Sequence, residues 1–341
     1  MIKSLTSLRG IFILFIFLHH AGLYQGGGTM AVAFFFVLSG FSMTLGYREK
    51  VFLPDFSYKQ YLVRRGIKFY PLHWITLLVD IPLVLMSTLF WWLVPVFFVN
   101  AALLQTLVPV EEVYFSYNAV SWFLADILFF AVLFPFLLKG ICRSTTKKRI
   151  ALFALLMVLY GVLAWIVPTD FRHAVFYISP YVRILDFIFG ILLGLCYLDI
   201  RTKRPSYNIK RWLPLAAVCI LILLLVAESY FLNAEVQLFA PVYWPLVAML
   251  ILCAALPQNG ELRILENRIL IRLGECSFTI FLVHRLVLRY MALLVGIDNV
   301  YLNAAVCLLL TILISLLIDR FILTPVSQWL RRKLQPSTTA Q

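Results

Sequence analysis

Leu8-Arg9-Gly10-Ile11-Phe12-Ile13-Leu14-Phe15-Ile16-Phe17-Leu18-His19-His20 is an apolar run with a cation near one end and two imidazoles at the other. In a helix, the eleven steps from Arg9 to His20 place both side chains within about 20° of one face and about 16 Å apart along the axis. Such residues on a lipid-length helix are expected to face the protein interior or an aqueous cavity, because contact with lipid is costly. The run therefore predicts an inward-facing pathway. A cytoplasmic anchor at Arg9 and an interfacial residue at His20 are the alternative.

The composition is that of a membrane protein with several spans. Of the 341 residues, 63% are apolar and 16% are aromatic, and the formal net charge is +13. In a soluble protein this charge would suggest nucleic-acid binding, but here the cations lie in short loops between apolar segments. We therefore expect contact with the lipid bilayer and none with nucleic acid.

Apolar segments of bilayer length predict an all-α integral membrane protein with about ten transmembrane helices in one bundle. Lys and Arg are concentrated in alternate loops, and the positive-inside rule then places both termini in the cytoplasm. The expected spans are residues 8–24, 30–47, 70–91, 119–139, 149–168, 180–199, 212–232, 238–256, 276–295 and 301–324.

The segment 92–118 is apolar but short for a span, and we interpret it as a re-entrant or interfacial segment at the outer face. Counting it as a span would place the basic loop 139–149 outside and break the charge pattern. No soluble domain or fixed-period repeat is recognised in the sequence. We expect one membrane domain over 1–330 and a short basic cytoplasmic tail over 331–341.

A second basic element lies at the cytoplasmic entrance of the third expected span, where Arg64, Arg65 and Lys68 precede Tyr70. Arg64 and Lys68 are four residues apart and are neighbours on one helical face. Clustered cations suit a polyphosphate ligand, and Arg offers bidentate contacts to phosphate oxygens. Positive-inside anchoring is the alternative, and Tyr70 suits an interfacial anchor in either case.

Other polar residues inside expected spans are further candidates, because such residues are rare in lipid and mark pathways or sites. Ser39 has no base beside it in sequence, so helix packing is its expected role. Arg183 and Asp186 are three residues apart and can form a structural ion pair on one face. The remaining candidates are Trp122, Asp126, Ser277, His284 and Arg285. We expect no metal site.

In their order along the chain, these motifs resemble the membrane acyltransferase family 3. The similar segments are Arg9 to His20, Phe35 to Phe41, Arg64 to Pro71, Trp122 to Pro135, Pro180 to Gly194, and Leu273-Gly274 through Ser277 to His284. Three positions depart from the family pattern. Asp126 comes four residues after Trp122, whereas many relatives have a glutamate five residues after the tryptophan. Arg285 and Leu286 follow His284 in place of the usual residues that lead to a proline. Lys68 occupies a position where Arg is common.

The resemblance implies a stand-alone bacterial enzyme of the inner membrane. Such an enzyme transfers an acyl group, with acetyl favoured over succinyl, from cytoplasmic acyl-coenzyme A to a hydroxyl of an extracytoplasmic or lipid-linked glycan. By this resemblance, Arg64, Arg65, Lys68 and Tyr70 bind coenzyme A, Arg9 binds a phosphate or orients the donor, and His20 is a general base or a transient acyl carrier. We expect no permanently bound cofactor, and an envelope-biosynthesis protein is a candidate partner.

Two alternatives stay open. In a transporter or exporter of a glycan or small anion, the same buried charges would line a translocation path. Transporters often show related halves with matched helix breaks, and no such repeat is evident in the sequence. The protein could also be an inactive structural partner in an envelope assembly. Coenzyme A binding separates the enzyme from both alternatives.

Overall fold

The computed structural model describes residues 2–24, 28–86, 90–203, 216, 218–223, 225, 234–256 and 263–334. Over these residues the fold is all-α, as predicted, and contains no strand. The main helices are α1 (Lys3–His20), α2 (Gly28–Tyr47), α3 (Tyr58–Leu85), α4 (Phe90–Ala101), α6 (Trp122–Cys142), α7 (Thr146–Ile166), α9 (Pro180–Lys203), α12 (Trp244–Ala255), α13 (Arg268–Glu275), α14 (Ser277–Leu294), α15 (Val300–Ile318) and α16 (Thr324–Leu334).

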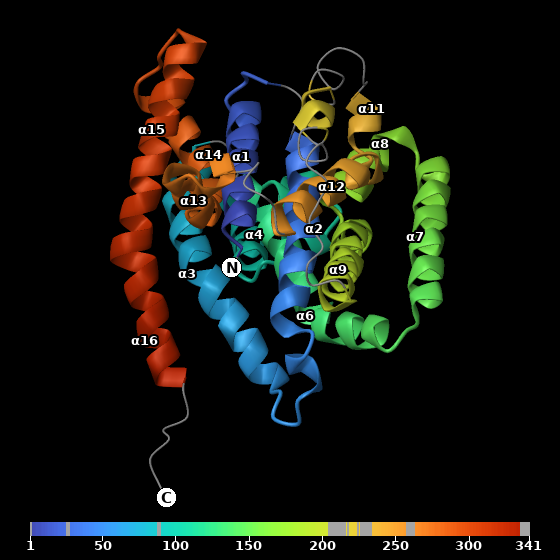
Figure 1. Cartoon of the computed structure of the whole chain (residues 1–341). Helices are drawn as coiled ribbons and strands as arrows, with labels where there is room; N and C mark the ends of the chain where they lie inside the picture. The colour runs from blue at the N-terminus through green and yellow to red at the C-terminus, as the bar shows by residue number, and fades with distance from the viewer. Residues whose placement is uncertain are drawn as a thin grey trace, which may run out of the picture.

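Short helical turns connect these helices. They are η1 (Lys50–Phe52), η2 (Gln105–Leu107), α5 (Glu111–Tyr114), η3 (Ala119–Ser121), α8 (Thr169–Arg172), η4 (His173–Ile178), α11 (Ala234–Gln237), η5 (Ala240–Val242), η6 (Arg263–Glu266) and η7 (Asp319–Leu323). Of these, η7 joins α15 to α16, so the three form one long rod at the edge of the molecule (Figure 1).

Within the described residues, seven helical segments are long and apolar enough to cross a bilayer. They are Gly28–Tyr47, Tyr58–Leu85, Ala119–Cys142, Thr146–Ile166, Pro180–Lys203, Ser277–Leu294 and Val300–Leu330. These segments are those of a multi-pass membrane protein. The expected total of about ten spans and the cytoplasmic location of both termini stay predictions.

Three expected spans are not among the seven. The first is the 18-residue helix α1. The expected span 238–256 is divided, because prolines begin η5 and α12, and α12 has only 12 residues. The expected span 212–232 lies outside the described residues except for 216, 218–223 and 225.

The expected boundary of the third span is wrong, because α3 begins at Tyr58 rather than near residue 70. Ser57 caps this helix by accepting a hydrogen bond from the Gln60 backbone N–H at 3.3 Å. Arg64, Arg65 and Lys68 therefore lie on a regular helix. Residues 92–118 contain most of α4, with η2 and α5, and none of these is long enough to cross a bilayer.

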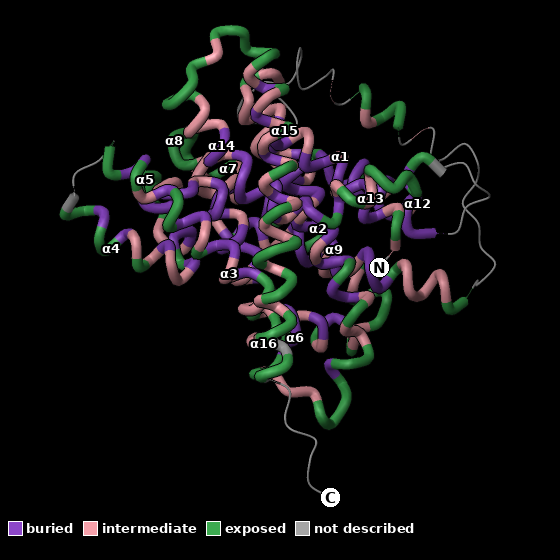
Figure 2. The backbone as a smooth tube through the Cα atoms, turned by 90° about the vertical axis from the view of Figure 1, so that its left-hand side faces the viewer, coloured by how far each residue is buried: buried purple, intermediate pink, exposed green. Residues whose placement is uncertain are grey.

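Helices α2 and α9 pack closely in the centre of the molecule, where buried residues predominate (Figure 2). A Cβ atom on Gly40 would lie 2.1 Å from the Phe187 carbonyl oxygen, and one on Gly190 would lie 2.1 Å from the Val37 carbonyl oxygen. The two backbones can approach this closely only because glycine has no side chain. The glycine that follows Ser39 is thus explained by helix packing.

Helices α7 and α15 lie at opposite edges of the molecule (Figure 1). Both expose large apolar side chains, which include Leu155, Val158, Val162 and Trp165 on α7 and Leu302, Leu309, Leu313 and Leu317 on α15. An apolar outer surface of this kind suits contact with lipid chains.

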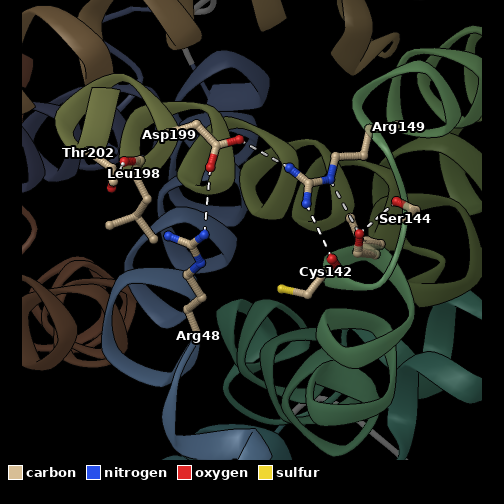
Figure 3. Close-up of polar contacts among 8 residues, drawn as sticks. Arg48, Cys142, Ser144, Arg149, Leu198, Asp199 and Thr202 are labelled. Atoms are coloured by element: carbon tan, nitrogen blue, oxygen red, sulfur yellow. Dashed lines mark hydrogen bonds and ion pairs between the residues drawn. The ribbon is translucent and has the colours of Figure 1, made fainter. Parts of the chain in front are cut away.

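An ion cluster ties four helix ends together on the side expected to face the cytoplasm (Figure 3). Asp199 of α9 pairs with Arg48, just after α2, at 3.6 Å and with Arg149 of α7 at 3.3 Å. The Arg149 guanidinium also donates to the carbonyl oxygens of Ile141 and Cys142, at 3.3 and 3.4 Å. It thereby satisfies backbone acceptors at the end of α6.

Candidate active site

The two residues of the opening motif lie on α1, and each is held by a residue of α14. One Arg9 guanidinium nitrogen donates to the Ser277 hydroxyl at 2.9 Å. His20 contacts His284, with 3.0 Å between the Nδ1 of His20 and the Nε2 of His284. Ser277 and His284 are seven residues apart, about two turns, and so lie on one face of α14. The structure therefore brings Arg9, His20, Ser277 and His284 into one unit of two adjacent helices.

Glycines explain how this unit is assembled. Helix α13 packs against α1, and a Cβ atom on Gly274 would lie only 1.7 Å from the Thr6 carbonyl oxygen. A Cβ atom on Gly10 would lie 2.8 Å from the Leu270 carbonyl oxygen. The close approach positions the start of α14, where the Ser277 hydroxyl donates to the Gly274 carbonyl at 2.8 Å. The same hydroxyl is then available as an acceptor for Arg9.

A cavity of about 780 Å³, which we call the inner cavity, lies beside Arg9. Two further cations line it, Arg65 and Lys68 of α3. The Arg65 guanidinium carbon lies 5.3 and 5.1 Å from the ring centroids of Tyr47 and Tyr61, which hold it by cation–π contacts. The described residues that line this cavity include no carboxylate, so the cavity suits an anionic ligand.

Of the other residues predicted for this region, some line the inner cavity and others lie outside it. Ser39 and Ser277 line the inner cavity. Arg64 is exposed and does not line it. The Tyr70 hydroxyl donates to the Ala102 carbonyl at 3.1 Å and so ties α3 to the end of α4. The arrangement places only part of the predicted coenzyme A set on the cavity wall.

A second cavity of about 450 Å³, which we call the outer cavity, contains His20. It shares no lining residue with the inner cavity. The predicted residues Trp122 and Arg285 also line it. Sequence reasoning missed His173, Tyr177 and Gln237, because they come from short turns that carry no helical periodicity.

Aromatic rings form a continuous row along the outer cavity. Ring centroids are 5.0 Å apart for Trp122 and Tyr177, 5.1 Å for Tyr177 and His173, and 5.8 Å for His173 and Phe115. All four side chains line the cavity. Burial lowers the pKa of His173, and the nearby Glu111 opposes this effect. Ring faces in a row give an extended apolar surface beside the polar group at His20.

The hydrogen bonds assign the tautomers of the two histidines. The Nδ1 of His284 lies 3.1 Å from the Ile280 carbonyl oxygen, which only accepts, so this nitrogen carries the proton. The Nε2 of His284 then accepts from the Nδ1–H of His20, which also lies 3.0 Å from the Ile16 carbonyl oxygen. The Nε2 of neutral His20 keeps its lone pair. A base oriented in this way can remove a proton from a hydroxyl in the outer cavity.

Phenylalanines of the inner cavity extend to the histidine pair. Phe35, Phe123 and Phe281 line the inner cavity, and the ring centroids of Phe123 and Phe281 are 5.0 Å apart. The Phe281 ring is also 5.9 Å from the His284 ring. Trp122, the neighbour of Phe123, lines the outer cavity. Consecutive residues of α6 thus contribute to the two cavities.

Asp126, Arg183 and Asp186 are buried and line neither cavity. Arg183 pairs with Asp186 at 3.2 Å, and the Trp244 indole N–H donates to Asp186 at 2.5 Å. The Arg183 guanidinium carbon also lies 4.9 Å from the centroid of the Phe36 ring. This geometry agrees with the structural ion pair expected from the sequence for Arg183 and Asp186. Among the described residues, no group of His, Cys, Asp and Glu is arranged to bind a metal.

The fold and the two cavities define a multi-pass membrane protein whose candidate site extends along one helix. Residues 2–320 match the model of the acyltransferase 3 family, which is described as an acyltransferase domain. The chain therefore belongs to the acyltransferase 3 family. It is also 26% identical over 299 residues to acyltransferase MdmB of Streptomyces mycarofaciens. The aligned residues cover 79% of this chain and 70% of that protein. No solved structure matches the chain significantly.

Proposed function

We propose that the protein transfers an acyl group, preferentially acetyl, from acyl-coenzyme A in the inner cavity to a glycan hydroxyl in the outer cavity. Family membership establishes acyl transfer as the class of reaction. The observation that supports this assignment is the division of polar groups between the cavities, with basic side chains around one and a hydrogen-bonded histidine pair at the other.

The donor binds at the inner cavity. Coenzyme A carries several phosphate charges, and Arg65 and Lys68 provide cations for them. Arg9, fixed by Ser277, orients the part of the donor that extends toward His20. The acyl end passes between Phe123 and Phe281, so these rings must separate during the reaction. This opening is a side-chain and helix motion of the kind that accompanies substrate binding in many enzymes.

The acceptor binds at the outer cavity, where its sugar ring packs on the row of aromatic rings. The Nε2 of His20 takes the proton of the acceptor hydroxyl, and the hydroxyl oxygen attacks the thioester carbonyl carbon. The carbon–sulfur bond breaks, the ester forms, and the coenzyme A thiolate leaves and receives the proton from His20. His284 accepts from the Nδ1–H of His20 in both the neutral and the protonated ring, and so fixes its orientation.

The proposed location is a bacterial cytoplasmic membrane, with an extracytoplasmic or lipid-linked glycan as acceptor and an envelope-biosynthesis protein as a candidate partner. The apolar outer helices α7 and α15 support insertion in a bilayer. A donor made in the cytoplasm and an acceptor on the other side require a site with access from both faces. The two cavities along α1 suit that requirement.

Transfer of radiolabelled acetyl from acetyl-coenzyme A to glycan, in membranes of the native host, tests the proposal. We compare the wild type, His20→Ala, and Leu14→Ala, a control on the same helix that lines neither cavity. Loss of a general base predicts a fall in rate of about 10²–10⁴-fold in His20→Ala only. Equal transfer by wild type and His20→Ala would contradict the assignment. No transfer from acetyl- or succinyl-coenzyme A, and no coenzyme A binding, would favour transport.

A further inference from the structure

Arg285 is the cation of the outer cavity, and the proposed reaction gives it no role. It follows His284 in α14, so it lies one residue from the imidazole that holds His20. In the described part of the chain, no carboxylate forms an ion pair with it. A guanidinium that lines a cavity without a carboxylate partner is a binding group for an anion.

Among the described residues, the acidic group that acts on Arg285 is Asp80, and it forms its ion pair with another residue. Asp80 of α3 is fully buried and forms its ion pair with Arg289 of α14, at 2.6 Å. Asp80 also acts on Arg285 electrostatically, so one carboxylate faces two guanidinium groups. Over the described residues, this leaves an excess of positive charge beside the outer cavity.

Among the described residues, the wall of the outer cavity carries no acidic group that would compensate that charge. The described residues that line it include three histidines and Arg285 but neither Asp nor Glu. Glu111 is close enough to act on His173, but it does not line the cavity. An electrostatic field of one sign over a cavity selects ligands of the opposite sign.

We infer that the acylated sugar unit itself carries an anionic group, a carboxylate or a phosphate, which Arg285 binds while the reacting hydroxyl lies at His20. This inference rests on the proposed function and narrows its acceptor from glycans in general to acidic ones. The sugar ring packs on Trp122 and Tyr177, the anion forms a charge-assisted hydrogen bond with Arg285, and the hydroxyl reaches the Nε2 of His20. Three contacts of different chemistry fix which hydroxyl is acylated.

The test uses the natural acceptor. Membranes of the native host that contain the wild-type protein are labelled with radioactive acetyl-coenzyme A, and the labelled glycan is degraded to its smallest labelled sugar. We expect this sugar to bind an anion exchanger and to elute only with salt. Treatment with alkaline phosphatase then distinguishes the source of the charge, because a phosphate is removed and a carboxylate is retained.

Variants of Arg285 test whether this residue binds the anionic group of the acceptor. Arg285→Gln is expected to raise the KM for the acceptor about tenfold to a hundredfold, because it removes one charge-assisted hydrogen bond. Arg285→Lys retains part of the affinity. Arg268→Gln, an exposed arginine outside both cavities, is the matched control and is expected to behave as wild type.

Each result decides between the possibilities. A smallest labelled sugar that passes the exchanger uncharged would overturn the inference while the proposed function stands. An acidic labelled sugar with an unchanged KM in Arg285→Gln would overturn the assignment to Arg285. Absence of label with the wild type, at the level of His20→Ala, would remove the proposed function and this inference with it.

Discussion

The inner and outer cavities lie along the same helix, α1, but their polar groups differ in kind. The inner cavity is lined by the basic side chains of Arg9, Arg65 and Lys68, which suit a polyanion. The outer cavity is lined by His20, whose neutral imidazole has a nitrogen lone pair that can accept a proton from a hydroxyl. In the proposed reaction, this difference assigns donor binding and proton transfer to separate ends of one helix.

The two cavities also have a feature in common, since α14 supplies the supporting residue at both ends. Ser277 accepts from Arg9, and His284 accepts from His20. Substitutions in α14 should therefore divide into those that weaken donor binding and those that slow the chemical step.

The largest expected effect is on donor binding. The double variant Arg65→Gln with Lys68→Gln removes two cations from the inner cavity. Each charge-assisted hydrogen bond is worth about 1.5–3 kcal/mol, so the Kd for coenzyme A should rise about 10²–10⁴-fold. Equilibrium binding of labelled coenzyme A measures this. Lys147→Gln with Lys148→Gln, at exposed positions, is the control, and equal affinities in the two double variants would contradict the assignment.

The next effect is on the packing that positions Ser277. Gly274→Ala places a Cβ atom 1.7 Å from the Thr6 carbonyl oxygen, so α13 must move away from α1. We expect a loss of about 3 kcal/mol in the free energy of unfolding, with weaker donor binding. Gly140→Ala, where nothing lies within 4 Å of the added atom, should be neutral or stabilising. Thermal unfolding in detergent compares them, and equal midpoints would show that this contact is unimportant.

His284→Phe keeps a ring but removes the acceptor that holds the His20 proton. Loss of an orienting partner predicts a fall in kcat of about tenfold to a hundredfold. The KM for acyl-coenzyme A should stay unchanged, because the proposed donor site is the other cavity. Steady-state kinetics separate the two constants. A raised donor KM with unchanged kcat would place His284 in donor binding instead.

The smallest expected effect is at Ser277. Ser277→Ala removes the acceptor for Arg9 at 2.9 Å, a bond worth about 1–2 kcal/mol in a partly buried site. The Kd for coenzyme A should rise about fivefold to thirtyfold, and kcat should change little. Ser277→Thr retains a hydroxyl and should restore most of the affinity. Titration with labelled coenzyme A measures the Kd of both variants. A larger effect on kcat than on Kd would contradict the assignment of Ser277 to donor binding.

Much of the fold could be predicted, because an apolar segment of bilayer length indicates a membrane-spanning helix by its length and composition alone. The helical periodicity of Arg9 and His20 predicted that they share a face, and the structure places both on cavity walls. Helix ends were less predictable. The divided segment at 238–256 differs from the expectation, because hydropathy alone does not register the helix breaks at Pro241 and Pro245.

The contacts that complete the site could not be predicted from local pattern. Ser277 is 268 positions from Arg9, and His284 is 264 positions from His20. Such contacts depend on which helices pack together, and here they depend on backbone approach at Gly274. The row of rings through His173 and Tyr177 arises from a turn, so no periodicity signalled it.

The central claim is that the donor enters by one cavity and the acceptor is acylated at the other. Sealed membrane vesicles of known orientation, given labelled acetyl-coenzyme A that cannot cross the bilayer, test it most directly. Inverted vesicles, which expose the cytoplasmic face, should label glycan in their lumen, and right-side-out vesicles should not. Equal labelling by intact vesicles of both orientations, or labelling that persists in His20→Ala, would contradict the claim.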